Sequence, residues 1–170
     1  MADHAGAATM KRQTLLLGLV MLLATSLASA AEFLPFNSES RAAIEQAHLG
    51  KPLILTFWSV DCAYCEDDLK LLGDIVKQHP EITLVTVCTD DPATAANAKK
   101  VLGKIDLPAH KQWQFAESDV ERLRYNIDKK WYGELPRTYF YNAQHQVKAV
   151  SGKPEKTWLD AWLKSLSVKP

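Results

Sequence analysis

Two cysteines separated by two residues, Cys62 and Cys65, are the residues of this 170-residue chain whose types and spacing could do chemistry. A cysteine thiolate can attack a disulfide, and a second thiol nearby can then displace the captured partner. The two-residue gap also allows the two sulfurs to close a disulfide with each other. The pair therefore predicts thiol–disulfide exchange, with Cys62 as the nucleophile and Cys65 as the resolving cysteine.

The elements around the pair must place Cys62 where a strand gives way to a helix. Residues 53–58 (Leu-Ile-Leu-Thr-Phe-Trp) are almost continuously apolar and short, which predicts a strand buried on both faces. A helix with one apolar face follows, marked by residues at gaps of four, three and four: Cys65, Leu69, Leu72 and Val76. Unpaired amide N–H groups at the start of a helix stabilise an anion, so a thiolate at Cys62 is favoured there.

Two simpler roles for the pair compete with catalysis. One is a structural disulfide, and the other is half of a zinc site. Zinc would need two further ligands, and the only candidates, Cys88 and His79, are not spaced as a second cysteine pair. Exchange chemistry is therefore the preferred interpretation and no metal is expected. Cys88 ends an apolar run and is predicted to be a buried free thiol.

The first thirty residues have the pattern of a secretory signal peptide. Lys11 and Arg12 precede the apolar run 15–23, and the small residues 28–30 (Ala-Ser-Ala) follow. Residues 1–9, which precede Met10, are interpreted as an upstream extension. An uncleaved membrane anchor and a core helix are the alternatives. Export to the periplasm is predicted, and that compartment permits disulfides.

Residues 31–170 are predicted to form a single α/β domain, an open mixed sheet with helices on both faces. Equal numbers of basic and acidic residues, 20 of each, argue against nucleic-acid binding, and 47% hydrophobic content argues against disorder. The segment 111–115 is unclear and could be a short strand. The remaining patterns predict helices within 36–49, 91–102, 118–125 and 158–166, a strand over 82–88, and a hairpin of strands 136–141 and 146–150.

Residues 57–65 (Phe-Trp-Ser-Val-Asp-Cys-Ala-Tyr-Cys) resemble the active site of the thioredoxin fold. Together with the predicted signal peptide, they are most similar to the periplasmic thiol–disulfide oxidoreductases of the TlpA/ResA/CcmG-like branch. The resemblance covers roughly residues 33–166 and implies a thioredoxin-like fold with a C-terminal hairpin and helix. The segment 134–138 (Glu-Leu-Pro-Arg-Thr) resembles the family's cis-proline loop. The resemblance therefore implies that Pro136 is a cis-proline facing the cysteines and that the backbone of Leu135 pairs with substrate.

Further site residues are expected around the pair. Trp58 is expected either to pack near the site or to contact substrate. Tyr64, between the cysteines, is expected to be exposed and is a candidate substrate contact. The resemblance implies that Asp90 is a candidate acid/base. The sequence also departs from the family: Asp61 precedes the first cysteine where tryptophan is usual, and Thr56 stands where thioredoxin has a buried aspartate. Four carboxylates near the pair, namely Asp61, Glu66, Asp67 and Asp68, are interpreted as complements to the helix dipole. Because they also disfavour a thiolate, Cys62 is expected to suit an electron donor.

The resemblance implies an exported reductase of disulfides in partner proteins, of the cytochrome c maturation or copper-site assembly type. Electrons would come from a membrane donor, and no cofactor is needed. Membrane attachment is expected only if the leader stays uncleaved. A disulfide oxidase or isomerase is the nearest alternative, and a copper-binding chaperone that uses both cysteines as soft ligands is the alternative outside enzymes.

Overall fold

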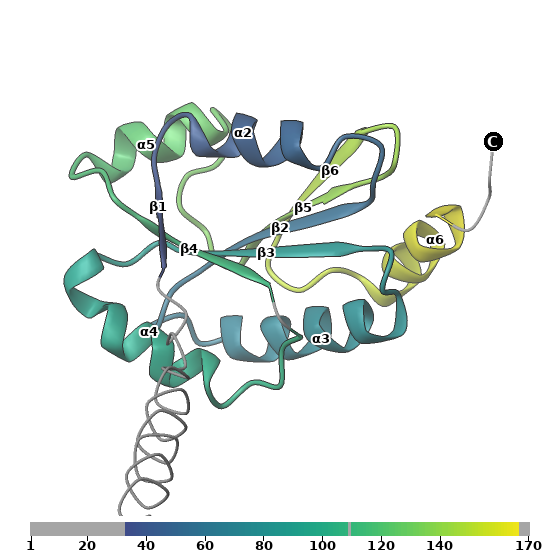
Figure 1. The fold of residues 1–170 in the computed structure, drawn as a ribbon, viewed down its shortest axis with the longest axis horizontal. Coiled ribbons are helices and arrows are strands. Elements are labelled where there is room, and N and C mark those ends of the chain that lie inside the picture. Colours follow the sequence, from purple (N-terminus) through teal and green to yellow (C-terminus); the bar gives the residue numbers. More distant parts are fainter. Residues whose placement is uncertain (1–32, 109, 167–170) are drawn as a thin grey trace, which may run out of the picture. The chain divides into compact units, whose positions relative to one another are not determined.

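A six-stranded mixed sheet is the centre of the computed structural model, which describes residues 33–108 and 110–166 (Figure 1). Its elements, in chain order, are β1 (Leu34–Phe36), α2 (Ser40–Ala47), β2 (Leu53–Trp58), α3 (Cys65–Gln78), β3 (Thr83–Cys88), the short 3-10 turn η1 (Pro92–Thr94), α4 (Ala95–Leu102), β4 (Lys111–Phe115), α5 (Val120–Ile127), β5 (Arg137–Tyr141), β6 (Val147–Ser151) and α6 (Lys156–Leu166). The predicted leader, residues 1–30, lies outside the described residues. Within the described ranges, no helix has the length and apolar character needed to span a membrane.

The strand order is β1-β4-β3-β2-β5-β6. Strands β1, β4, β3 and β2 pair in parallel, and β5 and β6 are antiparallel to their neighbours. This arrangement confirms the predicted mixed sheet and its C-terminal hairpin. The strand β2 lies between two partners and is buried at all six positions, as its uninterrupted apolar sequence predicts.

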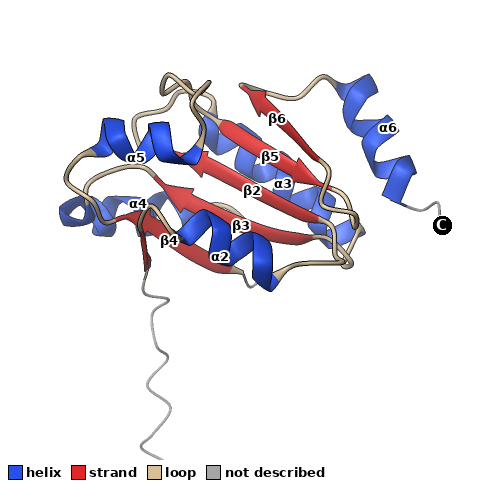
Figure 2. Ribbon diagram, turned by 90° about the horizontal axis from the view of Figure 1, so that it is seen from above, coloured by secondary structure: helices blue, strands red, loops and turns tan. Residues whose placement is uncertain are grey.

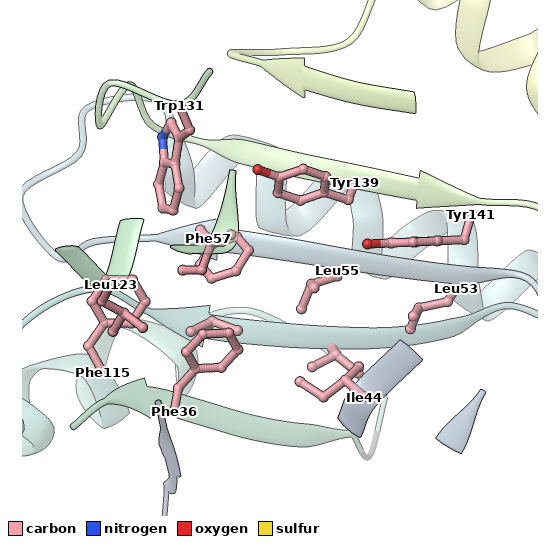
Figure 3. Close-up of a cluster of buried hydrophobic side chains, with 13 residues drawn as sticks. Phe36, Ile44, Leu53, Leu55, Phe57, Phe115, Leu123, Trp131, Tyr139 and Tyr141 are labelled. Atoms are coloured by element: carbon pink, nitrogen blue, oxygen red, sulfur yellow. The ribbon is translucent and has the colours of Figure 1, made fainter. Parts of the chain in front are cut away.

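Helices cover both faces of the sheet (Figure 2). Alternate residues of β2 point to opposite faces, so Leu53, Leu55 and Phe57 pack with α2 and α5, whereas Ile54 packs with α3 and α6. Figure 3 shows the first of these clusters, in which the Phe57 ring lies beside Trp131, with centroids 5.0 Å apart. Both faces of β2 are therefore locked by packing, which fixes the direction in which the chain leaves the strand toward Cys62.

Two short strands at one side of the sheet correct the predicted boundaries. Phe36 belongs to β1 and not to a helix, because the helix begins only at Ser40, whose hydroxyl accepts a hydrogen bond from the Asn37 amide at 2.9 Å. The unclear segment 111–115 is β4, which pairs with both β1 and β3. Three residues that include Pro35 carry too little alternation to identify β1, and proline is tolerated there because β1 is an edge strand.

Candidate active site

The cysteine pair lies in the turn between β2 and α3. The two sulfurs form a disulfide of 2.08 Å, with the Cα atoms 5.4 Å apart. The regular helix starts at Cys65, and Cys62 lies in the preceding turn, where its carbonyl accepts from the Cys65 amide at 3.3 Å. Cys65 is 1% exposed, whereas Cys62 is only half-buried. Cys62 is therefore the more exposed residue of the pair, and Cys65 is the buried one.

The loop that leads into β5 approaches the pair from the neighbouring strand. The register of β2 and β5 places Phe57 opposite Arg137, so the buried Pro136 lies beside the end of β2. The Leu135–Pro136 peptide bond is cis, and the Pro136 carbonyl accepts a hydrogen bond from the Gly152 amide at 2.8 Å.

The side chain of Leu135 joins two parts of the molecule. It packs against the cluster of Phe57 and Trp131, and also against the cluster that contains Cys65, on which Cys62 packs as well. Among the residues that the structure describes, neither the N–H nor the C=O group of Leu135 has a hydrogen-bond partner. The structure thus brings Leu135 and the two cysteines to one end of the sheet.

The two aromatic residues proposed as substrate contacts lie at different depths. Tyr64, between the cysteines, is 73% exposed. Trp58 is 1% exposed and packs with Cys65 and Leu69 in the cluster beneath the pair. Its side chain does not reach the surface, because the alternation of β2 turns it toward the helices. Tyr64 is therefore positioned to touch a partner, and Trp58 supports the site from below.

Asp90, the candidate acid/base, holds the turn that precedes Cys62. Its carboxylate accepts hydrogen bonds from the Ser59 hydroxyl at 2.6 Å and from the Val60 amide at 2.8 Å. It also accepts from the Cys88 thiol at 3.2 Å. Cys88 is a buried free thiol, as expected, and burial raises its pKa to about 12. Since β2 and β3 are parallel, this carboxylate ties their two C-terminal ends together.

Replacing Asp90 with alanine is expected to loosen this turn. The Val60 amide and the Ser59 hydroxyl would lose their acceptor, and the free energy of unfolding should fall by about 2 kcal/mol. Urea denaturation would measure the change. Asp91→Ala is the matched control. The Asp91 carboxylate accepts a hydrogen bond from the Ala93 amide in a cap contact, so its replacement should lower the free energy of unfolding by about 1 kcal/mol or less. Equal losses in the two variants would show that Asp90 has no special positioning role.

A buried carboxyl group, Asp68, is the residue that the sequence interpretation missed. It is 2% exposed, and neither carboxyl oxygen has a hydrogen-bond partner within the described ranges. Burial raises its pKa to about 7, against the smaller opposing effect of Lys153. Asp68 follows Cys65 by three residues, so both side chains lie on the same side of α3. That spacing was visible in the sequence, but the neighbouring acids suggested a surface role.

The neighbouring acids do have the surface role expected of them. Glu66 and Asp67 lie in the first turn of α3, and the Lys70 ammonium is 3.0 Å from one carboxylate and 3.7 Å from the other. The hydrogen bond from Lys70 lowers the pKa of Glu66. Such exposed pairs complement the helix dipole and contribute little to stability. Asp68 is therefore buried and has a raised pKa, whereas Glu66 and Asp67 are surface acids paired with Lys70.

Comparison with known proteins identifies the fold. No known protein family matches the sequence, and no curated protein matches it. Among solved structures, DsbF from MTB is 24% identical, with a TM-score of 0.58, over 72% of this chain and 85% of that chain. A secreted Mycobacterium tuberculosis disulfide oxidoreductase homologous to E. coli DsbE is 19% identical, with a TM-score of 0.56, over 71% of this chain and 86% of that chain. A thiol-disulfide isomerase from Corynebacterium glutamicum is 13% identical, with a TM-score of 0.59, over 74% and 86%. The chain thus has the thioredoxin-like fold of such proteins, with a cysteine pair closed as a disulfide.

Proposed function

We propose that this chain, with its thioredoxin-like fold, is an exported thiol–disulfide oxidoreductase that reduces disulfides in partner proteins. One observation carries the proposal: a half-buried Cys62 is disulfide-bonded to a fully buried Cys65 at the end of β2. Accessibility suits a nucleophile, and burial suits a resolving thiol that must not react with solvent species first. The free backbone of Leu135 beside the pair supports recognition of an extended polypeptide by main-chain hydrogen bonds.

The exchange starts from the reduced pair. The Cys62 thiol loses its proton, and the thiolate attacks one sulfur of the partner disulfide, so a Cys62–partner bond forms and the partner S–S bond breaks. The departing partner thiolate takes up a proton. Cys65 then loses its proton and attacks the Cys62 sulfur, which closes the Cys62–Cys65 disulfide and releases the second partner sulfur as a thiolate. This thiolate also takes up a proton. The partner gains two electrons and two protons, and the cysteine pair loses the same number.

Asp68 is the group proposed to take the proton from Cys65. A carboxyl group with a pKa of about 7 exists in both protonation states near neutral pH, as a proton acceptor requires. It lies one turn from Cys65 inside the protein, where water is largely excluded. Asp90 is assigned a positioning role in place of acid/base chemistry, because its carboxylate is engaged by the turn that precedes Cys62.

Return to the reduced state requires a dithiol protein as reductant, and a membrane electron donor is proposed for this step. Disulfide-bearing exported proteins, of the cytochrome c maturation or copper-site assembly type, are the proposed substrates. The signal-peptide pattern in residues 1–30 supports export to the periplasm. The description of one similar structure as secreted is consistent with this location.

The reduction potential of the Cys62–Cys65 couple tests the direction of the proposed reaction. Equilibration with glutathione buffers, followed by alkylation of the free thiols, measures it. A value near about −270 mV is expected for a reductant, and a value near about −120 mV would identify an oxidant instead. Reduction of insulin by the pre-reduced protein is the accompanying activity assay. Stoichiometric Cu(I) binding without any insulin reduction would favour the copper chaperone.

A further inference from the structure

We propose that a notch between α5 and the loop 128–134 binds an acidic segment of the disulfide-bearing partner; this inference rests on the proposed function and concerns substrate recognition. The notch has a volume of about 220 Å³. Its walls combine two cationic and three aromatic side chains with a single acid: Arg124, Lys129, Tyr125, Trp131, Tyr132 and Glu121.

The loop wall of the notch is held in place by contacts with the core. Trp131 is buried, and its ring packs on Phe57 (Figure 3). Its indole N–H donates a hydrogen bond to the Glu134 carbonyl at 2.9 Å. The Tyr132 amide donates to the Glu134 carboxylate at 3.2 Å. At the start of the loop, Asp128 forms a 2.6 Å ion pair with the largely buried Arg137. The loop wall of the notch is therefore already ordered in the free protein, so little conformational entropy is lost when a partner binds.

The two cations of the notch form no ion pair with any described residue, although Glu121 also lines it. Neither Arg124 nor Lys129 has a carboxylate within ion-pairing distance in the part of the chain that the structure describes. The Lys129 ammonium lies 5.6 Å from the centre of the Tyr125 ring, a cation–π distance. An aspartate or glutamate side chain would gain both a charge partner and hydroxyl donors there.

The aromatic side chains give the notch its apolar surface. Tyr132 is 85% exposed, and Tyr125 is also well exposed. Large exposed aromatic groups of this kind are typical of surfaces that bind proteins. Together with the two cations, they fit a polypeptide that carries acidic residues, and they do not fit a basic one.

Tyr132, which lines the notch, lies close in the chain to Leu135, which packs beside the cysteines. Tyr132 precedes Leu135 by three residues, so their Cα atoms are at most about 11 Å apart. A partner chain aligned along Leu135 with its disulfide at Cys62 therefore reaches Tyr132, at one wall of the notch, within a few residues. The acidic residues are expected about three to five positions from the attacked cysteine.

Disulfide peptides that differ only in charge test this recognition. Three peptides carry the same two-cysteine loop and, four residues away, either Asp-Glu, Ser-Ser or Lys-Lys. In low salt the pre-reduced protein should reduce the acidic peptide about tenfold faster than the serine peptide, and high salt should remove the difference. The Arg124→Glu/Lys129→Glu variant should lose this preference. The matched control is Lys148→Glu/Lys164→Glu, which makes the same charge change on β6 and α6 and should keep the preference.

A binding measurement separates this inference from the proposed function. The oxidised protein is titrated with the acidic peptide after both peptide cysteines are replaced by serine. NMR amide shifts should concentrate at Tyr125, Lys129 and Tyr132. If these shifts appeared but none of the disulfide peptides was reduced in the activity assay, the proposed function alone would be overturned. Reduction without charge preference, or equal preference in the Arg124→Glu/Lys129→Glu variant, would overturn the acidic-partner inference alone.

Discussion

Replacing Cys62 with serine is expected to lower the rate of disulfide reduction by on the order of a thousandfold or more. The hydroxyl group at this position cannot attack a disulfide, and Cys65 is too deeply buried to substitute for it. Insulin reduction with dithiothreitol as the electron source would measure the loss. Retention of the rate in the Cys62→Ser variant would remove the cysteine pair from the mechanism.

Cys65→Ser separates attack from resolution. In that variant Cys62 still attacks, but the mixed disulfide is not displaced, so a covalent partner adduct should accumulate and be visible by mass spectrometry. Cys88→Ser is the control for the chemical change itself. A serine hydroxyl can donate to Asp90 as the thiol does, so this variant should keep most of the activity.

Replacing Asp68 with asparagine is expected to change how stability depends on pH. Because burial raises the folded-state pKa of Asp68 to about 7 from an ordinary value of 3.8, the native state binds more protons than the unfolded state between these values. The stability of the wild-type protein should therefore fall as pH rises through this window and level off above pH 7. The contribution is about 4 kcal/mol, at about 1.4 kcal/mol for each unit of pKa difference.

The asparagine variant lacks this titration. The difference in free energy of unfolding between the variant and the wild type should therefore shift in favour of the variant by up to about 4 kcal/mol between pH 4 and pH 8. Urea denaturation at a series of pH values measures the difference. Asp67→Asn, the exposed neighbour on the same helix, should follow the wild-type curve. If the Asp68 and Asp67 variants gave parallel curves, Asp68 would not be a titrating buried carboxyl group.

The sequence predicted the elements next to the cysteine pair because their signals are local. The short apolar run 53–58 favoured a buried strand, and the spacing from Cys65 to Val76 marked the helix face. The prediction was wrong at β1, because its three residues form a strand only through pairing with β4. The same pairing explains why 111–115 remained uncertain. Strands defined by distant partners carry weak local patterns.

The site could be predicted only in part for the same reason. Cys62 and Cys65 are recognisable by spacing, whereas the role of Asp90 depends on bonds to Ser59 and Val60 about thirty residues away. Nor does the local sequence distinguish Asp68 from Asp67, because burial is a tertiary property. The notch likewise depends on how α5 packs beside the loop that follows it.

The buried thiol of Cys88 can serve as a probe of local unfolding. In the oxidised protein the other two cysteines are already consumed, so alkylating reagents have a single target among the three. That target lies at the end of a central strand with no solvent contact, and its very weak acidity slows labelling further. The labelling rate of Cys88 therefore reports how often the middle of the sheet opens transiently. It does so independently of any disulfide exchange at Cys62 and Cys65.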